Sequence, residues 1–175
     1  MAAARRLIFI ALGSNIGDRD GHLHGARRRL AANRDILVVA ASCLYETTAV
    51  GPAGQGAYLN AVLEIATPLA PIDLLALLLE IERAEGRDRG VRSVRWGPRT
   101  LDLDLLLYGG VCLDEPGLTL PHPHLHERAF VLEPLCELAA DLEHPLIGGR
   151  LDEHLARCRD PLNVRPYAGD GWQTG

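Results

Sequence analysis

Residues 95 to 108 read RWGPRTLDLDLLLY, and the strand expected in their second half begins with two aspartates and ends in leucines. Successive side chains of a strand point to opposite faces, so Asp102 and Asp104 share one face of the sheet and the alternating leucines share the other. Two neighbouring carboxylates repel each other and take up protons more readily, unless a cation lies beside them. The stretch therefore predicts one apolar face, which the core covers, and one acidic face that requires a positive partner.

The segments around this strand predict an alternation of strands and helices. Apolar runs typical of strands occupy residues 7–12, 36–45, 57–67 and 101–109. Apolar residues at helical spacing predict helices over 19–33, 71–86 and 134–142, and a hairpin is expected with flanks at 111–113 and 118–120. The order β-α-β-β-α-β is typical of a ferredoxin-like α+β sandwich. In that fold an antiparallel sheet carries its two main helices on one face, and the other face stays free for a site.

Length and composition indicate one globular domain. The chain has 175 residues, of which 47% are hydrophobic and 23% are charged, an ordinary globular balance. We expect a single domain over 1–158 and an irregular tail over 159–175, where periodicity is lost and Pro and Gly recur. No apolar run approaches the roughly 20 residues of a membrane span, and the first ten residues lack the features of a signal peptide. The four cysteines are widely scattered, as expected for reduced thiols. We expect a cytoplasmic protein without membrane contact.

Charge is distributed unevenly along the chain. The net charge of −5 argues against a general nucleic-acid binder. Between Arg83 and Arg99, however, six arginines stand against two acidic residues, and Gly and Pro interrupt regular structure. The chain has no lysine, which excludes a phosphate-binding P-loop. Arginine binds phosphates well, and Mg²⁺ is usually held by one or two carboxylates plus substrate phosphates. The arginine-rich loop and the acid pair together predict a Mg²⁺–nucleotide site.

Three histidines alternate at His122, His124 and His126, a spacing that allows a His-x-His zinc site with an aspartate as a further ligand. The prolines beside them argue against a regular strand, so alternation does not by itself bring the imidazoles together. We interpret His124 and His126 as surface residues and His122, after an expected strand, as a phosphate contact. Tyr58 and Phe130 are interpreted either as core aromatics or as rings that stack on a flat heteroaromatic ligand.

Four stretches resemble the 6-hydroxymethyl-7,8-dihydropterin pyrophosphokinase family of folate biosynthesis. They are ALGSNIGD, YLNAV, GRDR followed by RWGPRTLDLDLLLYG, and LTLPHPHLHERAFVLEPL. The resemblance spans residues 7 to about 142, and RWGPRTLDLDLLLYG is its most specific part. It implies transfer of pyrophosphate from ATP to the hydroxymethyl group of the pterin, by in-line attack on the β-phosphorus with AMP as leaving group. It also implies ATP as co-substrate, two Mg²⁺ ions and a monomer or weak dimer.

The resemblance assigns roles to individual residues. The metal ligands are Asp102 and Asp104, and the catalytic positions are Arg95, Arg99, Asp102 and Asp104. The pterin positions are Thr47, Val50, Tyr58, Asn60, Trp96 and Phe130. The ATP positions are Glu82, Arg87, Arg89, Arg99, Leu105, Thr119, His122 and Arg128. The two aromatic rings are expected to sandwich the pterin, and the Asn60 amide can satisfy both a donor and an acceptor on its edge.

Two alternatives from other classes use the same residues. A Mg²⁺-dependent phosphohydrolase would employ the acid pair with water as nucleophile, but Asn60 and the aromatic pair argue against it. A non-catalytic nucleotide- or pterin-binding module would transfer nothing, but both aspartates and Arg99 argue against that. No dedicated general base stands out. We expect coordination by Mg²⁺ to lower the pKa of the pterin hydroxyl, with an aspartate oxygen taking the proton.

Overall fold

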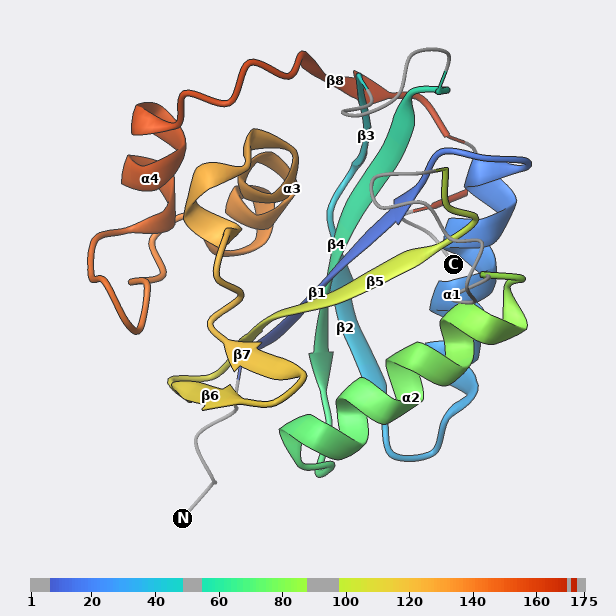
Figure 1. The fold of residues 1–175 in the computed structure, drawn as a ribbon, viewed down its shortest axis with the longest axis horizontal. Helices are drawn as coiled ribbons and strands as arrows, with labels where there is room; N and C mark the ends of the chain where they lie inside the picture. Colours follow the sequence, from blue (N-terminus) through green and yellow to red (C-terminus); the bar gives the residue numbers. More distant parts are fainter. Residues whose placement is uncertain (1–6, 49–54, 88–97, 170, 173–175) are drawn as a thin grey trace.

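A computed structural model describes residues 7–48, 55–87, 98–169 and 171–172. Its centre is a six-stranded antiparallel sheet (Figure 1). The strands are β1 (Ile8–Ser14), β2 (Leu37–Ala41), β3 (Leu44–Thr47), β4 (Tyr58–Ala66), β5 (Asp102–Tyr108) and β8 (Val164–Tyr167). Their order is β5-β1-β4-β3-β8, and β2 pairs with the opposite end of β4 from β3.

The strand expected over 36–45 is divided into β2 and β3. Ala41 pairs with Leu63 and Tyr45 pairs with Asn60, so both strands run along the same edge of β4. At the break, the Ser42 hydroxyl accepts a hydrogen bond from the Val62 backbone N–H at 2.9 Å. Because this side chain takes over a backbone contact, the chain can bend without leaving a buried N–H unpaired. Counted as one strand, β2 and β3 complete the predicted β-α-β-β-α-β order, and the predicted α+β class is confirmed.

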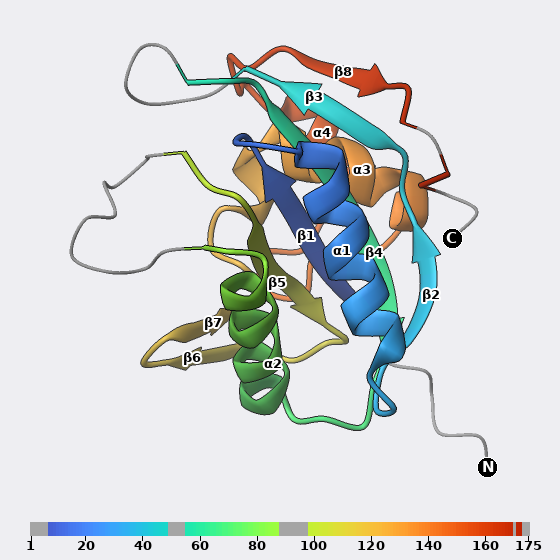
Figure 2. The ribbon, with the colours of Figure 1, turned by 90° about the vertical axis from the view of Figure 1, so that its right-hand side faces the viewer.

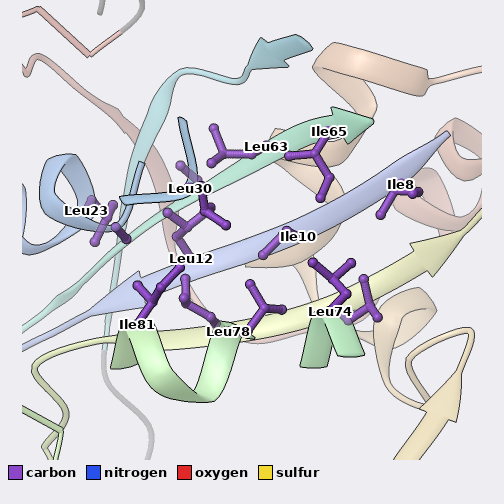
Figure 3. Close-up of a cluster of buried hydrophobic side chains, with 14 of the residues drawn as sticks. Ile8, Ile10, Leu12, Leu23, Leu30, Leu63, Ile65, Leu74, Leu78 and Ile81 are labelled. Atoms are coloured by element: carbon purple, nitrogen blue, oxygen red, sulfur yellow. The ribbon is translucent and has the colours of Figure 1, made fainter. Parts of the chain in front are cut away.

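Two helices, α1 (Arg19–Ala32) and α2 (Pro71–Ala84), cover one face of the sheet (Figure 2). The Asp18 side chain caps α1 by accepting from the Gly21 N–H, and Pro71 lies in the first turn of α2, where no N–H is needed. Fully buried aliphatic side chains of α1, α2, β1 and β4 fill this layer (Figure 3). The leucines that alternate with the acid pair, Leu101, Leu103 and Leu105, belong to the same core.

The sequence predicted that the opposite face is free, but α3 (Ala129–Ala139) covers part of it, and α4 (Leu151–Arg157) packs on α3 (Figure 1). Phe9, Val62 and Leu106 form a second core with Val131 and other residues of these helices. The helix expected over 134–142 begins five residues earlier, and Pro134 lies inside it rather than at its start. The predicted hairpin forms as β6 (Leu113–Glu115) and β7 (Leu118–Leu120), and the short 3-10 helix η1 (Leu125–Glu127) leads into α3.

Part of the segment expected to be an irregular tail is ordered structure. Val164–Tyr167 forms β8, which pairs antiparallel with β3 and becomes the edge of the sheet. Beyond it, Trp172 is 2% exposed and donates its indole N–H to the Ser42 carbonyl at 2.7 Å. The strand was not predicted because it has only four residues and their side chains lie mostly outside the core, so the sequence shows no regular alternation there. Among the residues that the structure describes, no helix is long and apolar enough to cross a membrane.

Candidate active site

The acid pair lies at the beginning of β5, on the face of the sheet that α3 covers elsewhere. Asp102 pairs with Gly13 and Asp104 with Ala11 on β1. A Cβ on Gly13 would lie 3.3 Å from Asn60 Oδ1 and 4.0 Å from Asp102 Cβ, so glycine leaves room between β4 and β5 at this point. The alternation predicted from the sequence therefore places both carboxylates beside the polar end of β4.

Two guanidinium groups neutralise Asp102. Arg87 bonds to Oδ1 and Arg99 bonds to Oδ2. Burial alone would raise the pKa of Asp102, but the charges and hydrogen bonds of these arginines hold it below its usual value. Asp102 is therefore ionised at neutral pH, which is the state in which it can bind a cation.

Asp104 lies in a different electrostatic environment. Among the described residues, its carboxylate makes no hydrogen bond or ion pair, and only charges at longer range act on it. Burial, followed by the charge of Asp102, raises the pKa of Asp104 to about 7. A carboxylate with high proton affinity and no fixed partner is suited to a hard cation, which would favour its ionised form.

A pocket of about 730 Å³ opens beside the acid pair. Its walls include Thr47, Tyr58, Asn60, Arg99, Asp102, Asp104, Arg128 and Phe130. Asn60 is 5% exposed and donates its amide N–H to the Thr47 hydroxyl at 2.9 Å, which leaves its carbonyl oxygen to accept from a ligand. Of the site residues that the sequence predicted, the structure thus brings two aromatic rings, a fixed amide, two arginines and the acid pair to one pocket.

His122 follows β7, and its backbone N–H donates to the Leu106 carbonyl at 2.9 Å. Burial, followed by the charges of Arg128 and His124, lowers the pKa of His122 to about 4. The ring is therefore neutral at pH 7. Its Nδ1 accepts from the His124 backbone N–H at 3.2 Å, so the proton is on Nε2. His122 can donate this N–H to a phosphate oxygen.

The alternative zinc site of His122, His124 and His126 does not form. The rings of His122 and His124 are 6.1 Å apart, but His126 instead packs 5.8 Å from His144 and 6.1 Å from His154. In the part of the chain that the structure describes, no group of three or more His, Cys, Asp or Glu side chains is arranged to hold a metal ion. Two carboxylates beside the guanidinium groups of Arg87 and Arg99 fit Mg²⁺, which keeps waters and is usually held by one or two carboxylates together with substrate phosphates.

Comparisons with known proteins identify the family. The sequence profile of the 7,8-dihydro-6-hydroxymethylpterin-pyrophosphokinase (HPPK) family matches residues 9–140. The chain belongs to this family. A Pseudomonas aeruginosa protein named 2-amino-4-hydroxy-6-hydroxymethyldihydropteridine pyrophosphokinase is 46% identical over 86% of this chain and 91% of its own length. A Bacillus subtilis protein of the same name is 42% identical over 86% of this chain and 89% of its own.

Solved structures of the family share the fold. The chain superimposes with a TM-score of 0.67 on a crystal structure of an HPPK-DHPS in complex with substrates, at 11% identity. The match covers 88% of this chain and 43% of that longer chain. The predicted architecture, including the β-α-β-β-α-β order, is therefore that of HPPK domains.

Several predicted HPPK positions lie away from the pocket or outside the described residues. Glu82 is 0% exposed, and its Oε1 accepts from Arg87 and from the Leu103 N–H, both at 2.8 Å. The Glu82 carboxylate thus binds the backbone of β5 inside the protein and is not available for direct contact with ATP. The Leu105 side chain is in the core, and the Thr119 hydroxyl donates to Asp114 on the hairpin at 3.1 Å. The predicted positions outside the described residues are Val50, Arg89, Arg95 and Trp96.

The sequence did not single out Asn15, which organises this HPPK site. Its side-chain oxygen accepts from the Arg99 N–H at 2.7 Å, and its amide donates to Gln55 at 3.1 Å. Asn15 thereby links Gln55 to Arg99, whose side chain lines the pocket. Its position in GSN, directly after β1, was the available signal. The pocket wall formed by 157–162 was also missed, and no motif marks it.

Proposed function

We propose that this protein transfers pyrophosphate from ATP to the hydroxymethyl group of 6-hydroxymethyl-7,8-dihydropterin, giving AMP and the pterin pyrophosphate. The names of its full-length relatives support this proposal. The observation that carries it is the position of the acid pair, Asp102 and Asp104, at the edge of a pocket whose other walls carry Tyr58, Asn60 and Phe130. A site for phosphates therefore adjoins a site for a flat, polar-edged ring.

The pterin is proposed to bind between Tyr58 and Phe130. Both rings line the pocket, and offset stacking on a flat heterocycle adds to the apolar area that is buried. Asn60, held by Thr47, presents its carbonyl oxygen to the donor groups of the pterin edge. Because this amide cannot turn without losing its bond to Thr47, it selects for a ring with donors at that edge.

The arginines and His122 are proposed to orient ATP. Arg99 lies beside Asp102, and Arg128 places its guanidinium 5.8 Å from the centre of the Phe130 ring, while its charge also acts on Asp104. Neutral His122 supplies an N–H donor that needs no proton uptake. Positioning and charge stabilisation of this kind account for most of the acceleration in phosphoryl-transfer enzymes. Arg89, Arg95 and Trp96, which lie outside the described residues, are proposed to complete the site.

Asp102 and Asp104 are proposed to hold two Mg²⁺ ions. When bound, Mg²⁺ neutralises phosphate charge and lowers the pKa of a hydroxyl that it coordinates. The chain itself supplies one ionised carboxylate and one whose ionisation a cation would favour. We propose that an aspartate oxygen takes the proton of the pterin hydroxyl, and that the protein acts as a monomer or weak dimer.

Nucleotide analysis tests the function. Purified protein is mixed with ATP and Mg²⁺, with and without 6-hydroxymethyl-7,8-dihydropterin, and Asp104→Ala is the control variant. AMP that forms only with the pterin and is lost in Asp104→Ala is the expected result. ADP or phosphate that forms without the pterin would instead indicate a phosphohydrolase. Tight ATP binding without turnover would indicate a binding module.

A further inference from the structure

The chain returns to the beginning of α3 after α4 has ended. One carboxylate oxygen of Asp160 accepts from the Ala129 backbone N–H at 3.0 Å, across 31 residues of sequence. The other oxygen accepts from the Leu162 N–H at 3.0 Å, which fixes the carboxylate within its own segment. Asp160 thus serves as an N-terminal cap for a helix to which it does not belong.

The Asp160 carboxylate takes the place of a capping side chain at the beginning of α3, where the helix's own N-cap residue provides none. Arg128 precedes the helix in an extended conformation and makes no capping hydrogen bond with its side chain. The first N–H groups of a helix have no partner within it, and a negative charge at this end is favourable. Asp160 supplies both the acceptor and the charge. Nearby, the Cys158 thiol donates to the Glu127 carbonyl at 3.3 Å, so the same segment holds the chain before and after Arg128.

The same segment is also fixed to the opposite wall of the pocket. Beyond Asp160 the chain forms β8, in which Val164 pairs with Thr47 of β3. Arg165 forms an ion pair with Glu46 in the same register. Residues 158–167 therefore connect the α3 end, which carries Phe130, to the strand whose Thr47 fixes Asn60.

We propose that Asp160 is a positioning residue for the pterin site. It acts through the first turn of α3, which it holds in the place where Arg128 and Phe130 face the pocket. Asp160 lies outside residues 9–140, the part that matches the family profile, and no family motif points to it. The inference rests on the proposed function, because the ligand that Phe130 contacts is taken to be the pterin.

Steady-state kinetics of Asp160→Ala and Asp160→Asn test the proposal. Loss of an N-cap acceptor is expected to raise the KM for the pterin about fivefold in Asp160→Ala. Asparagine retains an oxygen that can accept the Ala129 N–H, so Asp160→Asn is expected to restore most of the pterin KM. The control is Asn33→Ala, which removes a similar bond to the Asp35 N–H at 2.9 Å. Asn33 precedes β2, at the end of the sheet away from Thr47, and its variant is expected to keep the parental KM.

Hydrogen exchange of the peptide over 128–134 separates this proposal from the proposed function. Faster exchange there in Asp160→Ala than in Asp160→Asn is expected whether or not the protein turns over ATP. If the parent protein forms AMP with the pterin but all three variants share its pterin KM, the positioning role is wrong. If the parent forms no AMP, the proposed function fails, and unchanged exchange in Asp160→Ala would then overturn the cap itself.

Discussion

Replacing Asp104 with Asn is expected to stabilise the metal-free protein while it abolishes activity. Without a metal ion, the Asp104 carboxylate is partly buried beside ionised Asp102, and its pKa is raised to about 7 by burial and then by that charge. A folded-state pKa above the unfolded value means that folding favours the protonated form. Ionisation of Asp104 therefore costs no stability at low pH. The cost grows as the pH rises from 3.8, the ordinary pKa, to about 7, the pKa in the folded state, and is complete above pH 7. Asparagine has no charge and does not carry this cost.

The size of the gain follows from the two pKa values. A pKa raised from 3.8 to about 7 sets an upper limit of about 4 kcal/mol on the cost above pH 7. Because the side chain opens onto the pocket, solvent screens the charge, and the expected gain is about 1–2 kcal/mol. For a domain of this size, that free energy corresponds to an increase in Tm of about 3–6 °C.

Thermal unfolding with a chelator at pH 8 and pH 5 measures this effect. Asp104→Asn is expected to unfold at a higher temperature than the parent protein at pH 8, with a smaller difference at pH 5. Asp102→Asn is the matched control and is expected to lower the Tm, because it leaves Arg87 and Arg99 without their shared partner. Mg²⁺ with ATP is expected to stabilise only the parent. A lower Tm for Asp104→Asn at pH 8, or a gain that is equal at both pH values, would refute this reasoning.

Three further substitutions test other parts of the structure. Asn15→Ala is expected to lower kcat/KM about tenfold with little change in Tm, because it removes one of the two hydrogen bonds between Asn15 and the Arg99 backbone but no core contact. Equal kinetics in both proteins would contradict this. Trp172→Ala is expected to cost about 3–5 kcal/mol in urea unfolding. Trp172→Phe loses the indole bond to Ser42 and part of the ring but keeps a buried aromatic side chain, so it is expected to cost less. For His122, a pKa lowered to about 4 means that the folded state resists protonation, so the parent loses stability as the pH falls from about 6.5 towards 4. His122→Gln is expected to lose less stability over that interval in acid titrations followed by circular dichroism, and an identical acid transition would argue against the buried neutral ring.

The sequence predicted the parts of the fold that depend on periodicity. Alternation in the LDLDL stretch placed the acid pair and the leucines on opposite faces, and the β-α-β-β-α-β order followed from apolar runs of ordinary length. The break between β2 and β3 depends instead on one hydroxyl, Ser42, which contacts Val62 across the sheet. Such a contact leaves no local pattern, because the partner is remote in the sequence.

In the candidate site, too, residues in sequence motifs were predicted and residues that depend on remote contacts were not. Asp102, Asp104 and Asn60 were found because motifs mark them, and the structure brings them to one pocket. The family resemblance assigned Glu82 to ATP, but its side chain is buried and accepts from the Leu103 N–H of β5. A resemblance in sequence does not show where this side chain points. Asp160 has no motif at all. Its role depends on the segment after α4, which returns to the beginning of α3. This contact joins residues far apart in the sequence, so local sequence patterns do not reveal it.

The ion pairs of Asp102 with Arg87 and Arg99 affect how the metal ion and the nucleotide bind to the site. In the metal-free protein these guanidiniums already occupy the carboxylate, so a bare divalent cation would have to displace them and then remain beside two positive charges. A cation that carries nucleotide phosphates brings its own anions, which the displaced arginines can bind in turn. We therefore expect the metal ion and the nucleotide to bind together. The arginines would then move from the Asp102 carboxylate to the phosphates, and would pair with Asp102 again after the products leave.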